Sequence, residues 1–486
     1  MSQGYFHDFQ KTLEAGDTIA VLRKGLVGEG VMVEGPLGPQ KMIYADYIAS
    51  GRALMQVEWA VLNDVLPFYA NSHTEGSLCG ATMTRLRREA RAFIAGECGA
   101  DERHAVIFTG SGATSALNRI VGLLGVTDAV ARGETPLVLI GPYEHHSNIL
   151  PWRESGAEVI EIPEAVNGGP DMAALEAALK GGQRRLMIGS FSAASNVSGI
   201  VTDVEAVTRL LKRHGALAVW DYAGGGPYLT VDMATGTDAE IDAVALSPHK
   251  FVGGPGASGV LVVRKAAVTR KTPTIATGGG TVRFVSPWAH DYLEDVIARE
   301  EAGTPNVVGD IRAGLVFAVK AAMGQDRLDA RHEELRQRAL DAWRGLPGLQ
   351  IMGNPEADRA LPFFSIRLND EKGADRLHPL LLTRILSDCF GIQARGGCAC
   401  AGPYGHRLLG IDEATSDAIR ARILRGDALL KPGWTRFNLS ALMDDEKADK
   451  VIDAIRLIAT NPERYAALYS FDAATGDFTL RKKSAA

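Results

Sequence analysis

Three side chains that could do chemistry together stand within four residues of one another: Ser247, His249 and Lys250. Two short apolar runs, 243–246 and 260–263, flank them, and we predict that both runs are strands joined by a tight, glycine-rich loop. A lysine amine forms an imine with an aldehyde when its surroundings hold its pKa down. The serine and the histidine can bind an anion on the same side, while a surface lysine in a turn is the plainer interpretation.

Asp221 and His145 each follow another predicted strand, 217–220 and 137–140 respectively. A carboxylate placed against a pyridine nitrogen keeps that nitrogen protonated, and the ring then accepts electrons from a carbanion. His145 begins a pair of adjacent histidines, which suits stacking on an aromatic ring or binding a metal, although many such pairs are only surface residues. Each feature alone has a plain alternative, but their shared position at strand ends favours one common site.

The turn 110–114 sits after the predicted strand 105–108 and opens a helix. Free backbone N–H groups and the helix dipole at such a position favour a phosphate. The turn therefore predicts a phosphate site, although glycine-rich turns also serve close packing.

The elements that must position these residues alternate along the chain. From about residue 104 to 265, short apolar runs are separated by helical stretches, which predicts an α/β fold with a mostly parallel sheet between helices. Ligands bind at the carboxyl ends of the strands in such a sheet. After about residue 320 the pattern becomes α+β. We predict an N-terminal extension, 1–40, that packs on the small domain, a large domain, 41–320, and a smaller α+β domain, 321–486.

The composition is that of an ordinary globular protein. Hydrophobic residues make up 46% and charged residues 23% of the 486 residues, which is enough chain for two domains. A formal net charge of −6 argues against nucleic acid as the main partner. No apolar run approaches the roughly 18–20 residues that a membrane span needs, and the N-terminus lacks the pattern of a secretory signal. Five cysteines are an odd and sparse number, so a cytoplasmic location fits best.

Five motifs make the resemblance to a known family specific. They are Ala70-Asn71-x-His73, Glu144-His145-His146-x-Asn148-Ile149, Ser195-Asn196-Val197-x-Gly199, His249-Lys250 and Glu301-Ala302-Gly303-Thr304-Pro305-Asn306. With them the chain resembles class V aminotransferase-type enzymes of fold type I, which depend on pyridoxal phosphate. Within that class it is similar to group II cysteine desulfurases and selenocysteine lyases. The resemblance runs from about Tyr44 to Ala459.

This resemblance implies roles for the residues named above. Lys250 would hold the cofactor as an imine, Asp221 would pair with the pyridinium, and His145 would stack on the ring. The full set of cofactor-binding residues that we expect is Gly112, Ala113, Thr114, His145, Asp221, Ala223, Ser247, His249 and Lys250, with Gly280 and Thr304 reaching the phosphate in the partner subunit of a homodimer.

The resemblance also implies a substrate site and a nucleophile. Asn196 and Arg395 would grip the carboxylate of an amino acid, with Ala49 and His73 as further substrate contacts. Cys400 follows Arg395 by five residues and would take the sulfur of L-cysteine, or the selenium of selenocysteine, as a persulfide and release alanine. The catalytic residues would then be Lys250, Cys400 and His145, and a sulfur-acceptor protein or a small molecule would take the sulfur onward.

The Cys-x-Cys spacing of Cys398 and Cys400 is also similar to the desulfurase-like domain of molybdenum cofactor sulfurases. These two cysteines could instead ligate a metal with His406, but cysteines one residue apart are poor zinc ligands without a second pair, so we predict no metal site. One departure from the family is Gly224, which stands where a glutamine usually contacts the ring oxygen. Another class V reaction, by a β-lyase, an epimerase or an aminotransferase, therefore stays open, as does a non-catalytic protein with this fold.

Overall fold

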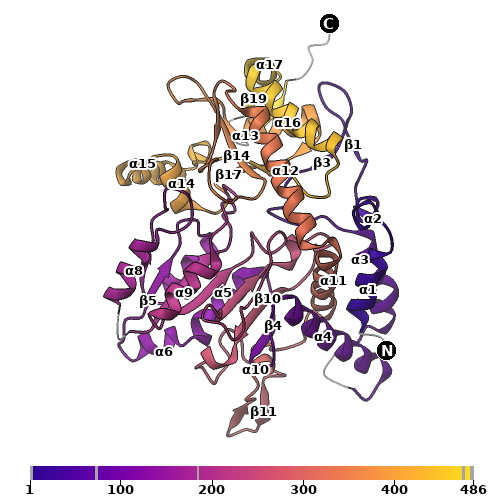
Figure 1. Cartoon of the computed structure of the whole chain (residues 1–486), viewed down its shortest axis with the longest axis vertical. Coiled ribbons are helices and arrows are strands. Elements are labelled where there is room, and N and C mark those ends of the chain that lie inside the picture. Colours follow the sequence, from indigo (N-terminus) through magenta and orange to yellow (C-terminus); the bar gives the residue numbers. More distant parts are fainter. Residues whose placement is uncertain (1–3, 72–74, 183–184, 473–476, 482–486) are drawn as a thin grey trace. The chain divides into compact units, whose positions relative to one another are not determined.

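The computed structural model describes residues 4–71, 75–182, 185–472 and 477–481 (Figure 1). The chain divides into two compact units. The large unit contains Met1–Val27, Ser50–Ser195 and Val201–Arg327, and the small unit contains Gly28–Ala49, Asn196–Ile200 and Leu328–Ala486.

A seven-stranded sheet forms the centre of the large unit. Its strands, in spatial order, are β4 (His104–Gly110), β10 (Gly259–Arg264), β9 (Ala243–Leu246), β8 (Leu217–Asp221), β7 (Met187–Ser192), β5 (Leu137–Ile140) and β6 (Glu158–Glu161). Neighbouring strands are parallel except where β10 meets β4 and β9. The predicted α/β fold with a mostly parallel sheet is confirmed.

Helices cover this sheet and precede it in the chain (Figure 1). They are α1 (Tyr5–Glu14), α2 (Thr18–Gly25), α3 (Met55–Ala60), α4 (Leu78–Glu97), α5 (Gly112–Leu123), α6 (Val126–Ala131), α7 (Leu150–Glu154), α8 (Met172–Gly181), α9 (Val204–Arg213), α10 (Val296–Glu300) and α11 (Val307–Met323). A hairpin of β11 (Val282–Val285) and β12 (His290–Tyr292) precedes α10.

Burial on both faces of the sheet explains why its strands read as continuous apolar runs. Every residue of β5 and β9 is buried. Helix α5 adds Leu117 and Ile120 to the same core cluster as Ile107 and Leu261 of the sheet. Full burial of one such side chain contributes about 1.5–3 kcal/mol. This packing fixes where each strand ends, and therefore where the loops that follow the strands begin.

The N-terminal helix packs on the large unit rather than on the small domain that we expected it to contact. Phe6 of α1 is only 1% exposed, and a Cβ atom at Gly314 of α11 would lie 2.5 Å from its ring. The absence of a side chain at Gly314 lets α1 and α11 approach closely, and α1 also contacts α4. Residues 28–49, in contrast, belong to the small unit, so the division within the first 50 residues falls at Val27 and not at residue 40.

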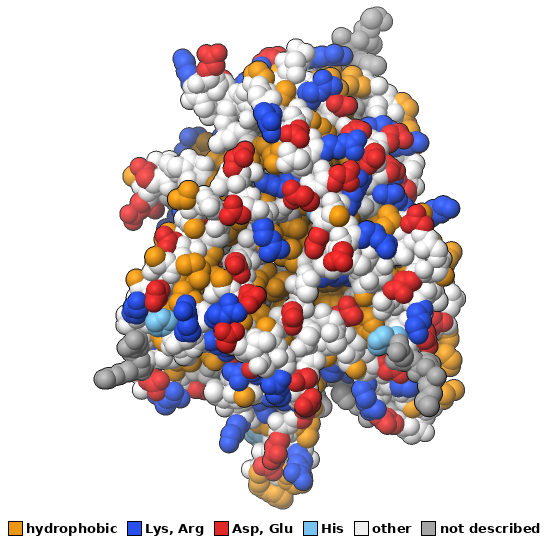
Figure 2. Space-filling view, viewed as in Figure 1, with side chains coloured by type: hydrophobic (Ala, Val, Ile, Leu, Met, Phe, Trp, Pro, Cys, Tyr) orange, Lys and Arg blue, Asp and Glu red, His pale blue; other side chains and the backbone are white. Residues whose placement is uncertain are grey.

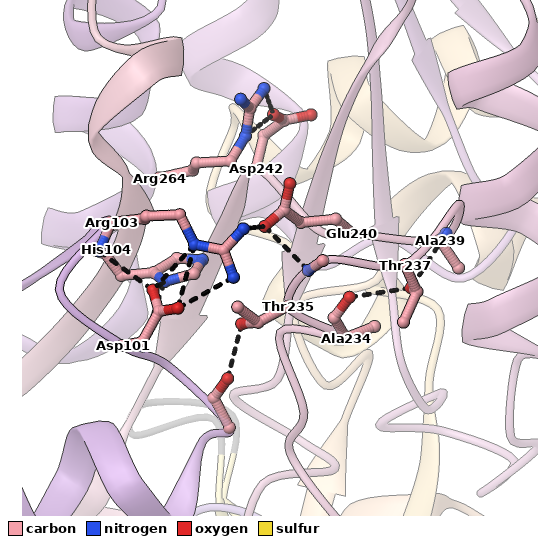
Figure 3. Close-up of polar contacts among 12 residues, drawn as sticks. Asp101, Arg103, His104, Ala234, Thr235, Thr237, Ala239, Glu240, Asp242 and Arg264 are labelled. Carbon is pink, nitrogen blue, oxygen red and sulfur yellow. Dashed lines mark hydrogen bonds and ion pairs between the residues drawn. The ribbon is translucent and has the colours of Figure 1, made fainter.

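Polar side chains tie together the strand ends opposite to the end that carries Asp221 (Figure 3). Asp242 is fully buried just before β9, and it accepts hydrogen bonds from the Ala218 N–H and from Arg264 Nε, both at 2.8 Å. It also forms an ion pair with Lys212. A second group of contacts, among Asp101, Arg103, His104 and Glu240, lies at the same end of the strands.

The small unit is built on a five-stranded antiparallel sheet. Its strands are β13 (Leu349–Ile351), β14 (Phe363–Asn369), β18 (Trp434–Asn438) and β17 (Arg395–Gly397) in spatial order, with β15 (Asp375–Leu377) also on β14. The other short strands pair as β1 (Met32–Val33) with β2 (Gln40–Lys41), β3 (Ile43–Tyr44) with β16 (Ile392–Gln393), and β19 (Tyr469–Asp472) with β20 (Asp477–Leu480). The predicted smaller α+β part is thus present.

Six helices complete the part of the small unit that is described. They are α12 (Gln325–Trp343), which starts in the large unit, α13 (Pro379–Phe390), α14 (Gly402–Leu408), α15 (Glu413–Ile423), α16 (Asp445–Thr460) and α17 (Pro462–Ala466). Ile43 and Ala45 join the core of this unit, which is why residues 28–49 belong to it. Among the residues described, no helix combines the length and the apolar character needed to cross a membrane.

Candidate active site

Lys250 ends a single turn of 3₁₀ helix, Pro248–Lys250, and is the fourth residue after strand β9. The Lys250 N–H closes this turn on the carbonyl of Ser247 at 2.9 Å. Gly51 holds the turn from outside, because its N–H donates to the His249 carbonyl at 2.8 Å and a Cβ atom there would lie 1.7 Å from the carbonyl oxygen of Phe251. Lys250 therefore lies on a tight loop directly after a strand, as the sequence predicted.

Asp221 ends the neighbouring strand β8, in register with Ala245 of β9. The residue is 4% exposed, and its Oδ1 accepts a hydrogen bond from the Ala223 N–H at 2.7 Å. Burial raises the pKa of Asp221, while that hydrogen bond and the positive charge of Lys250 lower it. Within the described part of the chain the other oxygen, Oδ2, has no hydrogen-bond partner. A cationic N–H group of a ligand would satisfy it.

The start of helix α5 lies against the Lys250 turn. The N–H of Ala113 donates to Ser247 Oγ at 2.9 Å, and a Cβ atom at Gly112 would lie 2.9 Å from both Ser247 Oγ and His249 Cε1. Gly112 has a φ of +61°, which a glycine adopts without strain. Burial and the charge of Lys250 lower the pKa of His249 to about 4, so its imidazole is neutral at pH 7. Helix N–H groups, a hydroxyl and an imidazole thus meet here and suit a phosphate.

His145 lies at the start of the short helix that follows β5, and it is half-buried. Its Nδ1 accepts a hydrogen bond from the Ser147 N–H at 3.1 Å, which leaves the proton of a neutral ring on Nε2. Ser147 Oγ lies 2.7 Å from Thr114 Oγ1, so the predicted phosphate residue Thr114 contacts the histidine loop. The structure thereby brings the His145 loop and the start of α5 together.

Glu144 is a residue of this site that the sequence did not single out for a role. Its carboxylate is buried and accepts hydrogen bonds from the Ser192 N–H at 2.8 Å and from Asn148 Nδ2 at 2.5 Å. Burial raises the pKa of Glu144 to about 7, against the effect of these bonds, and the negative charge of Asp221 raises it further. Glu144 fixes the loop that carries His145, and its place directly before that histidine was the available signal.

Arg395 begins strand β17 of the small unit, and its side chain is 56% exposed. Its Nε lies 3.0 Å from Oδ2 of Asp46, which is itself buried and also lies 3.3 Å from Arg436 Nη2. Within the described residues the terminal nitrogens of Arg395 have no partner. A guanidinium held through Nε in this way presents its two-pronged end to a carboxylate. Asp46 was missed by the sequence reasoning because nothing in its neighbours separates it from other strand-end aspartates.

The loop after β17 carries two free thiols. Cys400 is exposed and Cys398 is half-buried. Asn196, which we expected to bind substrate, donates a hydrogen bond from Nδ2 to the carbonyl of Ala399 between them at 2.8 Å. No group of three or more metal-ligating side chains occurs among the residues described.

Comparison with known proteins decides the family. The Aminotransferase class-V family matches residues 43–424. The chain belongs to this family. A probable cysteine desulfurase of Halalkalibacterium halodurans is 29% identical over 371 residues, covering 74% of this chain and 84% of that protein. One of Pyrococcus abyssi is also 29% identical, covering 79% of this chain and 90% of that protein.

Solved structures of cysteine desulfurases share the fold. The apo cysteine desulfurase of Thermococcus onnurineus superposes with a TM-score of 0.70 at 23% identity, over 86% of this chain and 95% of that one. The Escherichia coli cysteine desulfurase CsdA gives 0.67 at 21% identity, over 87% of this chain and 94% of that one. These matches confirm the predicted fold class and the predicted resemblance.

Five further residues were predicted to bind cofactor or substrate: Ala223, Ala49, His73, Gly280 and Thr304. Ala223 follows Asp221 and donates to it, and Ala49 ends a turn in the small unit that closes on the Asp46 carbonyl at 3.0 Å. His73 lies outside the described residues. Gly280 and Thr304 are both exposed on the large unit. Their roles stay predictions.

Glu301 anchors the motif that contains Thr304. It accepts a hydrogen bond from the Phe108 N–H of β4 at 2.8 Å and forms ion pairs with Arg87 and Arg91, at 2.7 and 2.8 Å. Its pKa is lowered by these arginines, although burial acts in the other direction. The Gly303 N–H donates to Gly279 O at 2.8 Å, which joins the two segments that are expected to meet a partner.

Proposed function

We propose that this class V protein is a cysteine desulfurase that removes sulfur from L-cysteine, or selenium from selenocysteine, and releases alanine. One observation carries the proposal: the exposed thiol of Cys400 lies on the loop that follows Arg395, whose terminal nitrogens have no partner among the described residues. The names of relatives that match about three quarters of the chain support it.

The large unit fits pyridoxal phosphate, which we propose as the cofactor. Lys250 would hold it covalently, Asp221 Oδ2 would accept the ring N–H, and His145 would stack on the ring. Gly112, Ala113, Thr114, Ser247 and His249 would hold the phosphate. When bound, the cofactor supplies an electron sink that stabilises negative charge at the substrate's α-carbon.

The chain's own side chains would then do the rest. Arg395 binds the substrate carboxylate through its terminal nitrogens. The thiolate of Cys400 attacks the substrate sulfur, a sulfur–sulfur bond forms, and the carbon–sulfur bond breaks with its electron pair going to the β-carbon. Protonation of that carbon gives the methyl group of alanine, and Cys400 keeps the sulfur as a persulfide. A thiol of a small molecule or an acceptor protein would supply the two electrons that release sulfide from this persulfide.

The products formed from L-cysteine test this function. Alanine and sulfide in equal amounts are expected, with the persulfide located on Cys400 by mass spectrometry of the loop peptide. Cys400→Ala should still bind cofactor but lose sulfide release by orders of magnitude, because the nucleophile has no substitute. Cys398→Ala is the matched control, and it should be far less damaged.

A β-lyase is the second candidate, and Gly224 favours it. This glycine takes the place of the family glutamine, so the cofactor's ring oxygen lacks that donor. Pyruvate and ammonia as products, with full turnover by Cys400→Ala, would replace the desulfurase proposal by this one.

We also propose that the protein is a homodimer located in the cytoplasm. Apolar side chains at helical spacing form an exposed stripe on the large unit, namely Trp59, Leu62, Leu66 and Tyr69, each 46–57% exposed. The β11–β12 hairpin adds Phe284, Val285 and Trp288, and hydrophobic side chains gather at this end of the molecule in Figure 2. A second copy of the chain would cover such surfaces.

A groove of about 420 Å³ on the large unit is where the partner's glycine segment would insert. Its lining includes Thr114, Asn118, His146, Ser147 and Leu150. Because Thr114 belongs to the expected phosphate site, Gly280 and Thr304 of a second copy would reach the phosphate from this side.

A further inference from the structure

The turn that carries Cys400 has an unusual backbone. The Ala401 N–H donates to the Cys398 carbonyl at 3.1 Å, so residues 398–401 form a closed β-turn. Its two central residues, Ala399 and Cys400, have φ values of +52° and +56°. Turns with two positive φ values select glycine, asparagine or aspartate at these positions, because a Cβ atom is strained there. This turn has none of the three, so its conformation must be imposed by its surroundings.

Both ends of the turn are held by backbone packing. Before it, Gly397 lies so close to Gly433 that a Cβ atom on Gly433 would be 2.7 Å from the Gly397 carbonyl carbon. After it, Ala401 is buried and its carbonyl accepts the Gly405 N–H at 2.8 Å, which starts helix α14. These contacts fix where the turn begins and ends, but they leave the peptide between its two strained residues unrestrained.

Asn196 holds that peptide. Its Nδ2 donates to the carbonyl oxygen of Ala399, which belongs to the peptide bond directly before Cys400. Asn196 is 8% exposed, and its backbone carbonyl accepts a hydrogen bond from Arg436 Nη1 at 3.1 Å. Arg436 pairs with Asp46, and Asp46 pairs with Arg395. A chain of contacts within the small unit, through Asp46 and Arg436, thus links Arg395 to Asn196 and the strained turn.

We propose that Asn196 is a positioning residue that holds the strained turn and so presents the thiol of Cys400. The proposal rests on the proposed function, in which Cys400 carries the sulfur. It differs from the role expected for Asn196, which was to grip the substrate carboxylate. One hydrogen of its amide is used on Ala399, whereas the terminal nitrogens of Arg395 have no partner among the described residues and can bind the carboxylate.

Asn196→Ala removes the hydrogen bond, and Ala399→Gly removes part of the strain. In Asn196→Ala we expect backbone amide exchange in peptide 398–401 to rise by about fivefold, the effect of one lost hydrogen bond. The kcat for sulfide release should fall by about the same factor, with KM changed less than about twofold. Adding Ala399→Gly to this variant should restore much of kcat, because glycine adopts a positive φ without cost.

Asn369→Ala is the matched control. Its Nδ2 also donates a hydrogen bond of 2.8 Å within the small unit, to Gln350 Oε1. The Oδ1 atoms of both Asn196 and Asn369 are buried without a hydrogen-bond partner among the described residues. It should leave exchange in peptide 398–401 unchanged. If Asn196→Ala does not fold, Asn196→Asp keeps the shape of the side chain but loses the donor, and the same changes are expected there.

Unchanged amide exchange in peptide 398–401 of the Asn196 variants would overturn the proposal. A KM raised about tenfold with kcat unchanged would also overturn it, because that result would show that Asn196 binds the substrate. Failure of the proposed function is distinguishable from this result. Full turnover by Cys400→Ala would refute the desulfurase reaction, whereas amide exchange is measured without substrate and reports only whether Asn196 holds the turn.

Discussion

Replacing Gly112 by alanine tests whether the start of helix α5 and the Lys250 turn form one phosphate site. The structure gives two separate costs. A Cβ atom at a φ of +61° costs about 1–2 kcal/mol. The same atom would lie 2.9 Å from Ser247 Oγ and from His249 Cε1, and overpacking of this kind costs about 1–3 kcal/mol. The free energy of unfolding should therefore fall by about 2–5 kcal/mol.

Gly110→Ala separates the two costs. Gly110 has a φ of +77°, but an added Cβ atom would meet nothing within 4 Å. This variant should lose only the backbone contribution, about 1–2 kcal/mol. Denaturant unfolding measures both variants, and an absorbance titration measures their affinity for pyridoxal phosphate. We expect affinity to fall at least about tenfold in Gly112→Ala and little in Gly110→Ala, because only the first displaces Ser247 and His249. Equal losses in the two variants would refute the close approach.

Three further predictions concern other parts of the large unit. Lys250→Ala should bind pyridoxal phosphate without an imine absorbance band, and borohydride should then attach no cofactor; attachment elsewhere would contradict the assignment of this lysine. Leu62→Asp should convert the proposed dimer into a monomer in sedimentation experiments, since it would bury a charge in the apolar stripe, and a stable dimer would rule the stripe out as the interface. Glu144 has a folded pKa of about 7, above its unfolded value near 4.5, so the wild-type protein should lose up to about 3 kcal/mol of stability as the pH rises from 4.5 to 7. Glu144→Gln should lack this slope, which unfolding at pH 5 and pH 8 measures; an unchanged slope would place the titration elsewhere.

The strand ends and their polar residues could be predicted from the sequence because a buried strand has a continuous apolar run and a sharp end. Asp221, His145 and Lys250 all stand where such a run stops. The small unit's sheet was harder to predict. Residues 28–49 join the small unit through the separate two-stranded parallel sheet β3–β16, which brings together segments about 350 positions apart, and no local pattern encodes such a pairing.

Backbone conformation explains most of what the sequence did not reveal about the site. Nothing in the types of Ala399 and Cys400 indicates positive φ values, since both residues normally avoid them. The hydrogen bond from Asn196 joins residues 203 positions apart, and it exists only because of that conformation. Glu144 was missed for a different reason, because a glutamate beside two histidines reads as an exposed polar loop until burial shows otherwise.

Asp221 Oδ2 has no hydrogen-bond partner among the described residues, so if pyridoxal phosphate is the cofactor, as proposed, its supply would affect how much folded protein exists. Its carboxylate is buried, and burial raises its pKa, so folding bears the cost of burying a charge that the Ala223 N–H and Lys250 only partly compensate. The N–H group of a bound pyridinium would offset that cost by pairing with the Asp221 carboxylate. Any ligand that binds only the folded state also stabilises it by mass action. Chains made when the cofactor is scarce would then be the ones most open to proteolysis, so their abundance would follow cofactor supply even at constant synthesis.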